Sequence, residues 1–171
     1  MAARKKAKAK QRKAKKTSTA GANRLDTRKV IETLNRILET ELAGVVRYTH
    51  YSFMIFGHSR IPIGSWMRDQ AREGMSHAEE AGEYITTLGG HPSLKIGQLL
   101  ETFQHDIDHI LREAVHHEKE GVLLYQKLLR LVKDKHIPLE EYARKLIHDE
   151  ELHIAEIEKM LRRPGRLEPA L

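Results

Sequence analysis

Four long segments with helical periodicity constrain the fold of this chain more than any other feature of its sequence. Within each segment apolar residues recur at intervals of three and four positions, the spacing of one face of an α-helix. We expect these helices at about residues 27–56, 62–88, 98–133 and 139–161. Alternating runs typical of strands are few, as are aromatic residues. The sequence therefore predicts an all-α fold, a four-helix bundle with mostly short connections.

Signals at the segment ends support this division. Asp26 is a good N-cap for the first helix, and Gly89 is a stop signal for the second. Pro138 occupies a first-turn position of the fourth helix, where its missing N–H is not needed. We therefore expect a bundle at residues 25–163 and a C-terminal tail at residues 164–171.

Residues 1–24 differ in composition from the rest and form a Lys/Ala-rich arm. The arm has no bulky apolar residue after Met1, so it cannot offset its ordering entropy and is expected to be disordered. The net charge is +6, but without the nine basic residues that precede Arg24 the chain has 21 basic and 24 acidic residues. These nine are candidate phosphate contacts for sequence-independent DNA binding: Arg4, Lys5, Lys6, Lys8, Lys10, Arg12, Lys13, Lys15 and Lys16. The alternative is a solubilising tail, or an arm that holds an acidic subunit.

The composition also excludes several classes of site. The chain has no cysteine, so it has no disulfide, no thiolate metal site and no thiol nucleophile, which fits a reducing cytosol. No apolar run approaches the roughly 20 residues of a membrane span. No apolar segment follows the basic N-terminus, as it would in a secretory signal. We therefore expect a cytoplasmic protein without membrane contacts, associated with the nucleoid if the arm binds DNA.

Every predicted helix carries an ionisable residue in the middle of its apolar stripe. These residues are Glu41, His77, Glu118 and, in the fourth helix, Glu150 with His153 one turn later. Burying three carboxylates in one bundle is untenable without positive charge, and no Lys or Arg occupies the stripes themselves. A bound cation is the simplest compensation, and carboxylate and imidazole donors suit Fe, Mn or Zn. The alternative is a set of half-exposed or hydrogen-bonded polar side chains.

The stretches around these residues resemble the ferritin-like di-iron carboxylate proteins, and among them the bacterioferritins. LNRILETELAGVVRYTH is similar to the first helix of that family, whose metal-binding Glu and later Tyr correspond to Glu41 and Tyr48. HHEKEGVLLY is similar to the third helix at Glu118, and HDEELHIAEIEKML contains the Glu-x-x-His of the fourth at Glu150 and His153. The resemblance implies an antiparallel bundle with one long crossover connection and a di-iron site. The catalytic residues that it implies are Glu41, Tyr48, Glu118 and Glu150.

The second helix departs from the pattern of the family. MSHAEEAGEYITTLGGHPSL resembles the end of that helix, but the Glu expected three residues before His77 is replaced by Gly74. Glu73 and Glu80 lie one turn before and after, within about 60° of His77 around the helix. We favour Glu73 as the substitute. The resemblance implies Glu41, His77, Glu118, Glu150 and His153 as metal ligands, and Glu73 completes the expected set as the substitute.

Met75 and three further histidines are weaker candidates. Met75 stands where bacterioferritins carry a haem ligand, so haem is a candidate cofactor, but an apolar subunit contact is the simpler interpretation. His105, His109 and His116 are spaced along one side of the third predicted helix, where they could line an iron entry path. We favour solvated or interface positions for these histidines.

The resemblance implies a protein that binds ferrous iron, oxidises it with oxygen or peroxide, and stores the product in a homo-oligomer between a dimer and a cage. Two other functions remain open from the sequence. A DNA-protecting protein resembling the miniferritins would act through residues 1–23, although their metal-site motifs are not found here. A ferritin-like oxidase or a manganese catalase would turn over an organic substrate or peroxide without accumulating iron.

Overall fold

The computed structural model describes residues 24–167. The nine basic residues predicted to contact DNA lie outside the described residues, and so do the last four residues of the predicted tail. None of the described helices combines the length and the apolar character that a membrane span needs.

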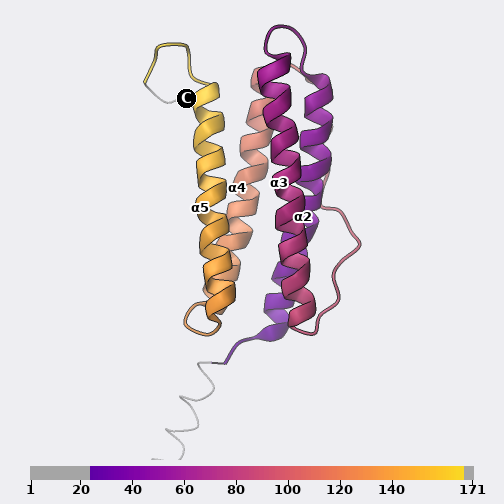
Figure 1. The fold of residues 1–171 in the computed structure, drawn as a ribbon, viewed down its shortest axis with the longest axis vertical. Helices are drawn as coiled ribbons and strands as arrows, with labels where there is room; N and C mark the ends of the chain where they lie inside the picture. Colours follow the sequence, from indigo (N-terminus) through magenta and orange to yellow (C-terminus); the bar gives the residue numbers. More distant parts are fainter. Residues whose placement is uncertain (1–23, 168–171) are drawn as a thin grey trace, which may run out of the picture.

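Four long α-helices make up most of the described part of the chain, which contains no strand and confirms the all-α prediction (Figure 1). They are α2 (Thr27–Met54), α3 (Arg60–Thr87), α4 (Ile107–Val132) and α5 (Ile137–Met160). The side chain of Asp26 caps α2 by accepting a hydrogen bond from the Lys29 amide, as the sequence predicts.

The helices form two packed pairs, α2 with α3 and α4 with α5, and α2 also packs against α4. The turns within each pair are short, whereas residues 88–106 form a long crossover that runs beside the first pair (Figure 1). The crossover returns the chain to the other end of the bundle, so α4 begins near the end of α2 and runs antiparallel to it (Figure 1). This is the antiparallel bundle with one long crossover that the resemblance implies.

The start of the third helix was predicted wrongly. The helix begins at Ile107 rather than near residue 98, because Asp106 caps it by accepting a hydrogen bond from the His109 amide. Phe103 has a φ of 56°, which no helix accommodates. Earlier in the crossover, the Gly97 amide donates to the Glu39 carbonyl of α2 at 2.7 Å, a close approach that a side chain at this position would block. The apolar residues of 98–106 have helical spacing although the segment is irregular, and this spacing led to the wrong prediction.

Two apolar clusters fill the bundle and leave a polar layer between them. One lies toward the α4–α5 turn and includes Leu34, Ile85, Leu128 and Leu139; the other lies toward the α2–α3 turn and includes Ile55, Met67, Ile110 and Ile157. Each of these side chains is fully buried and contributes roughly 1.5–3 kcal/mol to folding. The clusters hold the four backbones in register, so the polar residues at mid-length meet at one level.

Candidate metal centre

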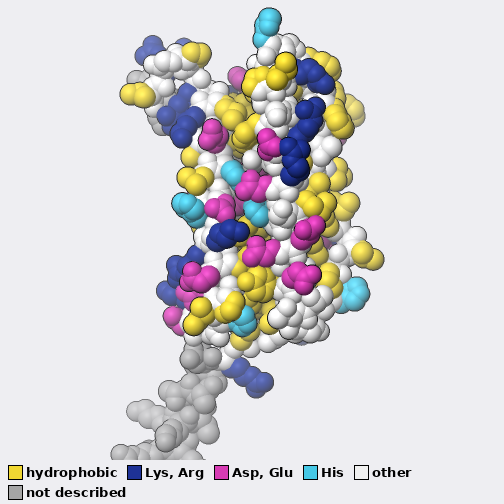
Figure 2. All heavy atoms as spheres, viewed as in Figure 1, with side chains coloured by type: hydrophobic (Ala, Val, Ile, Leu, Met, Phe, Trp, Pro, Cys, Tyr) yellow, Lys and Arg dark blue, Asp and Glu magenta, His cyan; other side chains and the backbone are white. Residues whose placement is uncertain are grey.

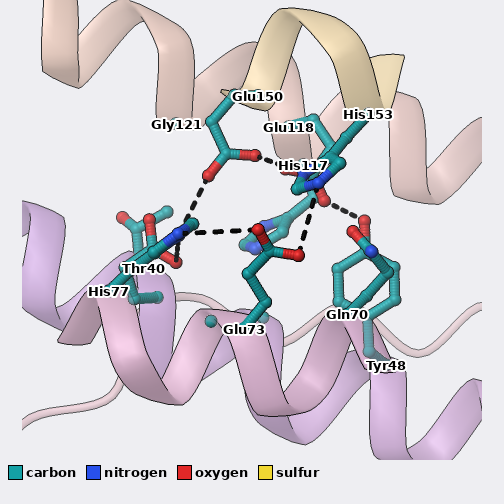
Figure 3. A pocket seen from close by; sticks show the side chains of 13 residues that line it. Thr40, Tyr48, Gln70, Glu73, His77, His117, Glu118, Gly121, Glu150 and His153 are labelled. Atoms are coloured by element: carbon teal, nitrogen blue, oxygen red, sulfur yellow. Dashed lines mark hydrogen bonds and ion pairs between the residues drawn. The ribbon is translucent and has the colours of Figure 1, made fainter. Parts of the chain in front are cut away.

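The mid-stripe residues of all four helices converge on one small cavity in the polar layer (Figure 3). Glu41 comes from α2, His77 from α3 and Glu118 from α4, while α5 supplies both Glu150 and His153. Their potential ligand atoms form two groups of three, and within each group the three atoms lie within 4.8 Å of one another. Both groups contain Glu150, so its carboxylate stands between two candidate metal positions.

The first group consists of Glu41, His77 and Glu150, all buried. The His77 Nδ1 lies 3.2 Å from one oxygen of Glu150 and 3.6 Å from one oxygen of Glu41. The other oxygen of Glu41 accepts a 2.8 Å hydrogen bond from the buried Tyr125 hydroxyl. Because Tyr125 occupies one oxygen of Glu41, the other oxygen is the one directed at the candidate metal position of this first group.

The second group consists of Glu118, Glu150 and His153. The His153 Nδ1 lies 3.2 Å from the Glu150 oxygen that does not face His77. The Tyr48 hydroxyl donates a hydrogen bond to Glu118, and both side chains are buried. Tyr48 therefore orients a candidate ligand without belonging to either group, as outer residues do around the ligands of metal sites.

Glu73 lies at the rim of the cavity, between the two histidines (Figure 3). Its carboxylate oxygens lie 4.0 Å from His77 Nε2 and 3.4 Å from His153 Nε2, and its side chain is 40% exposed. Glu80 instead lies 3.8 Å from Lys145 and does not line the cavity. The geometry thus supports Glu73 over Glu80 as the carboxylate of α3 at this site.

Gly74 leaves room at the position where the family pattern has a carboxylate. A Cβ atom built on Gly74 would lie 3.6 Å from the backbone oxygen of Glu41, from its side-chain Oε2 and from Val45 Cγ2, all ordinary van der Waals distances. A Cβ atom at position 74 would therefore fit without moving the helices, on the wall of the cavity beside Glu41.

The charges of the layer are coupled through burial and short contacts. Burial raises the pKa of Glu41, and burial together with the charge of Glu150 raises the pKa of Glu118 well above its usual range. Burial opposes the ionised form of Glu150, but hydrogen bonds from His153 and His77 outweigh it and lower the pKa of Glu150. Burial likewise opposes the charged form of His77, but contacts with the carboxylates of Glu150 and Glu41 raise its pKa to about 10. Cations that bind here must displace protons from these groups.

One buried arginine lies near the site, but its partners are not the site carboxylates. Arg47 donates to the Tyr51 hydroxyl and the Glu113 carbonyl, and one of its nitrogens lies 3.3 Å from His117 Nδ1. Burial, followed by the charge of Arg47, lowers the pKa of His117 to about 4, so this ring is neutral. Within residues 24–167 the ion pairs of the site carboxylates are with histidines. The positive charge that the sequence argument requires is therefore not supplied by Arg47.

Sequence reasoning missed the role of His117 in the wall of the cavity. The ring packs so closely on α2 that a Cβ at Gly44 would lie 2.7 Å from its Nε2. The sequence does contain a signal for this contact, because a histidine directly precedes Glu118 and a glycine, Gly44, occupies the facing position on α2. Such a pairing is recognisable only once the register of α2 against α4 is known.

Met75 does not line the cavity and lies on the outer surface of α3. It is 41% exposed and lines a shallow surface hollow with Val45, Arg68 and Arg72, among others. This placement is compatible with both interpretations of Met75, a haem ligand and an apolar subunit contact.

Comparison with known proteins places the chain in a structural family. A family model described as a ferritin-like domain matches residues 31–167. Ferritin-like di-iron carboxylate proteins of Bacillus anthracis have a TM-score of 0.72 at 26% identity, covering 80% of this chain and 98% of theirs. The Rhodobacter capsulatus bacterioferritin, described with a metal-free dinuclear site and haem iron, has a TM-score of 0.67 at 26% identity, covering 78% and 83%.

A dodecameric thioferritin, a bacterioferritin-related protein of Bacteroides fragilis, has a similar fold. Its TM-score is 0.75 at 21% identity, and the match covers 86% of this chain and 92% of that one. At this identity the similarity extends to the fold alone. No curated protein sequence matches the chain.

Proposed function

The chain belongs to the ferritin-like family, and on this basis we propose that it binds ferrous iron between its four helices, oxidises it and stores the product. The observation that carries the proposal is the pair of ligand groups that share Glu150. Four helices supply buried carboxylate and imidazole donors to one cavity, and no Lys or Arg of the described helices lines it. Such donors suit iron, and a carboxylate with two oxygens facing different histidines is suited to bridge two ions.

Iron is the substrate in this proposal, and the side chains hold it in place for electron transfer. Two Fe²⁺ ions each lose one electron, and O₂ accepts both electrons with two protons to give H₂O₂. When peroxide is the oxidant, it accepts the two electrons and two protons to give two water molecules. The carboxylates would stabilise the higher charge of Fe³⁺, and the imidazoles of His77 and His153 would each fix the position of one ion.

A homo-oligomer, as the family implies for storage, is supported by the apolar surface of the bundle. Figure 2 shows hydrophobic side chains distributed over one face of the described helices. Large apolar residues that are at least half exposed include Phe53, Phe56, Ile61, Leu123 and Leu152. Exposed apolar side chains that gather into one patch mark contact sites, and three of these residues, Phe53, Phe56 and Ile61, lie close in sequence around the α2–α3 turn.

The first test is an anaerobic titration of the metal-free protein with Fe²⁺, followed by admission of O₂. We expect two Fe²⁺ per chain, because each of the two ligand groups accepts one ion, and rapid growth of near-ultraviolet absorbance on oxidation. A stoichiometry of one or none with slow oxidation would contradict the paired site. Rapid turnover of peroxide or an organic substrate without an iron core would instead support the oxidase or manganese-catalase alternative.

DNA binding through the arm is a second function, supported by the separation of charge along the sequence. Nine basic residues precede Arg24, whereas the rest of the chain is mildly acidic. We expect the full chain to retard DNA and a chain lacking residues 1–23 not to do so. If all nine charges contact phosphates, the logarithm of affinity should fall with the logarithm of salt concentration at a slope of about −8. Equal retardation by the full and shortened chains at every salt concentration would exclude this role.

A further inference from the structure

A second group of potential metal ligands lies outside the cavity, where the crossover meets α2. It consists of His50 from α2 and of Glu101 and His105 from the crossover, and the three ligand atoms lie within 4.8 Å of one another. His50 follows Glu41 by nine residues, which places it about 180° around the helix from the central site. His105 precedes α4, contrary to the prediction that it lies on that helix. From this group we infer a separate binding site for one divalent transition-metal ion, which ties the crossover to α2.

The two imidazoles converge on the two oxygens of one carboxylate. His50 Nε2 lies 3.0 Å from Oε2 of Glu101, and His105 Nε2 lies 3.4 Å from Oε1. Two ligands bound about 2.1 Å from one ion lie about 3.0 Å apart at a right angle and about 3.4 Å apart at a tetrahedral angle. Each of these two nitrogen–oxygen distances therefore lies in the range of neighbouring ligands of one ion, and each runs to a different oxygen of Glu101.

The state of the two nitrogens is the second observation that points to a ligand. The Nε2 atoms of His50 and His105 are both shielded from solvent, and each faces an oxygen of Glu101 without a well-aligned hydrogen bond within the described residues. Two shielded nitrogens that face carboxylate oxygens without a well-aligned hydrogen bond form an arrangement that a shared cation would satisfy. Both rings keep an exposed edge, because the side chains are 42% and 27% exposed, so an ion can reach the site from solvent.

Glu101 is held in the conformation that the site needs. Its Oε1 accepts a 2.6 Å hydrogen bond from the Phe103 amide, across the turn in which Phe103 has a positive φ. This hydrogen bond, together with the two nearby imidazoles, lowers the pKa of Glu101, so the carboxylate is ionised as a metal ligand must be. Next to it, Thr102 donates to a carboxylate oxygen of Glu113 on α4 and so holds the crossover to that helix.

The donor set selects the class of ion. Two imidazoles and one carboxylate suit Fe²⁺, Co²⁺, Ni²⁺ or Zn²⁺, whereas Mg²⁺ and Ca²⁺ prefer oxygen ligands alone. Three protein ligands leave further positions for water, as in open zinc and iron sites. Because His50 lies on α2 and the other two ligands lie in the crossover, the bound ion would restrain the segment that leads into α4. This proposal does not depend on iron oxidation at the central site.

The experiment measures Zn²⁺ binding by full-length protein carrying Glu150→Gln, which weakens the central site. We expect one Zn²⁺ per chain to remain, and hydrogen exchange of backbone amides at residues 95–106 to slow by at least about 10-fold when Zn²⁺ is added. Adding Glu101→Gln should weaken Zn²⁺ binding by at least about 10-fold, the lower end of the loss when even an outer-shell partner is removed. The same addition should abolish the slowing. The glutamine oxygen can still accept from the Phe103 amide, so the turn is kept.

Two further variants complete the test. His50→Ala changes a residue of α2 away from the turn, and we expect it to reduce Zn²⁺ binding as Glu101→Gln does. His116→Ala is the matched control, because exposed His116 has one nearby carboxylate, Glu120 at 3.9 Å, and no third ligand among the described residues. Binding and exchange unchanged by both Glu101→Gln and His50→Ala would overturn the proposal. Slowing of exchange that persists in both variants would overturn it as well.

Discussion

Glu150→Gln is expected to remove both irons from the central site, although it changes one residue. Glu150 belongs to both ligand groups, with one oxygen facing His77 and the other facing His153. The amide keeps the size of the side chain but loses the negative charge that offsets the charge of two cations. We expect the anaerobic Fe²⁺ stoichiometry to fall from two to none. Oxidation should slow by at least about 100-fold, the upper end of the loss seen when an outer-shell partner is removed.

Two other glutamine variants show whether the loss of both irons arises because Glu150 belongs to both ligand groups. Glu118 belongs to the second group alone, so Glu118→Gln should weaken the binding of one iron and leave the other iron bound. Glu151 is the exposed neighbour of Glu150 in α5, and Glu151→Gln should bind and oxidise iron like the unchanged protein. If Glu150→Gln lost one iron only, as Glu118→Gln should, the two positions would not share a ligand and the arrangement proposed for the site would be wrong.

The polar layer was predictable because helix periodicity and burial act together. A residue three or four positions from apolar neighbours on both sides shares their face, and that face must be buried in a four-helix bundle. Periodicity alone places Glu41, His77, Glu118 and Glu150 on buried faces, and all four are buried in the bundle. The same argument applies to any chain whose helices are long and regular.

Features that depend on irregular segments could not be predicted in this way. The start of α4 depends on Asp106 and on the positive φ of Phe103, and neither leaves a periodic signal. The contacts of His50 with the crossover depend on the path of residues 88–106, which is fixed by hydrogen bonds such as that from Gly97 to Glu39. The contact of Arg47 with His117 depends on how α2 packs against α4. The start of α4 is a local feature, whereas the other contacts join residues far apart in sequence, and none of them has a repeating pattern.

Glu73→Gln is expected to slow iron oxidation by about 10-fold and to weaken binding of the second ion, a loss in the range found for residues that support metal ligands. Glu73 lies between His77 and His153 but is more exposed than the other ligands, so its contribution should be smaller than that of Glu150. Glu80→Gln is the control on the same helix, because Glu80 lies beside Lys145 and outside the cavity. Equal rates for the Glu73→Gln and Glu80→Gln variants would remove Glu73 from the site.

Gly74→Glu, added to Glu73→Gln, should restore and exceed the original rate of oxidation. A Cβ atom at position 74 makes only ordinary contacts, and we expect a carboxylate carried from it to enter the cavity beside Glu41 rather than stand at its rim. Without metal the same change should lower the thermal stability, because a further buried carboxylate beside Glu41 costs more than the gain of about 0.5 kcal/mol in helix propensity. With Zn²⁺ bound, the order of stability should reverse, because the cations offset the added charge. Melting curves of both variants with and without Zn²⁺ measure this reversal. A metal-free protein stabilised by Gly74→Glu, with no change in oxidation, would mean that position 74 does not face the metals.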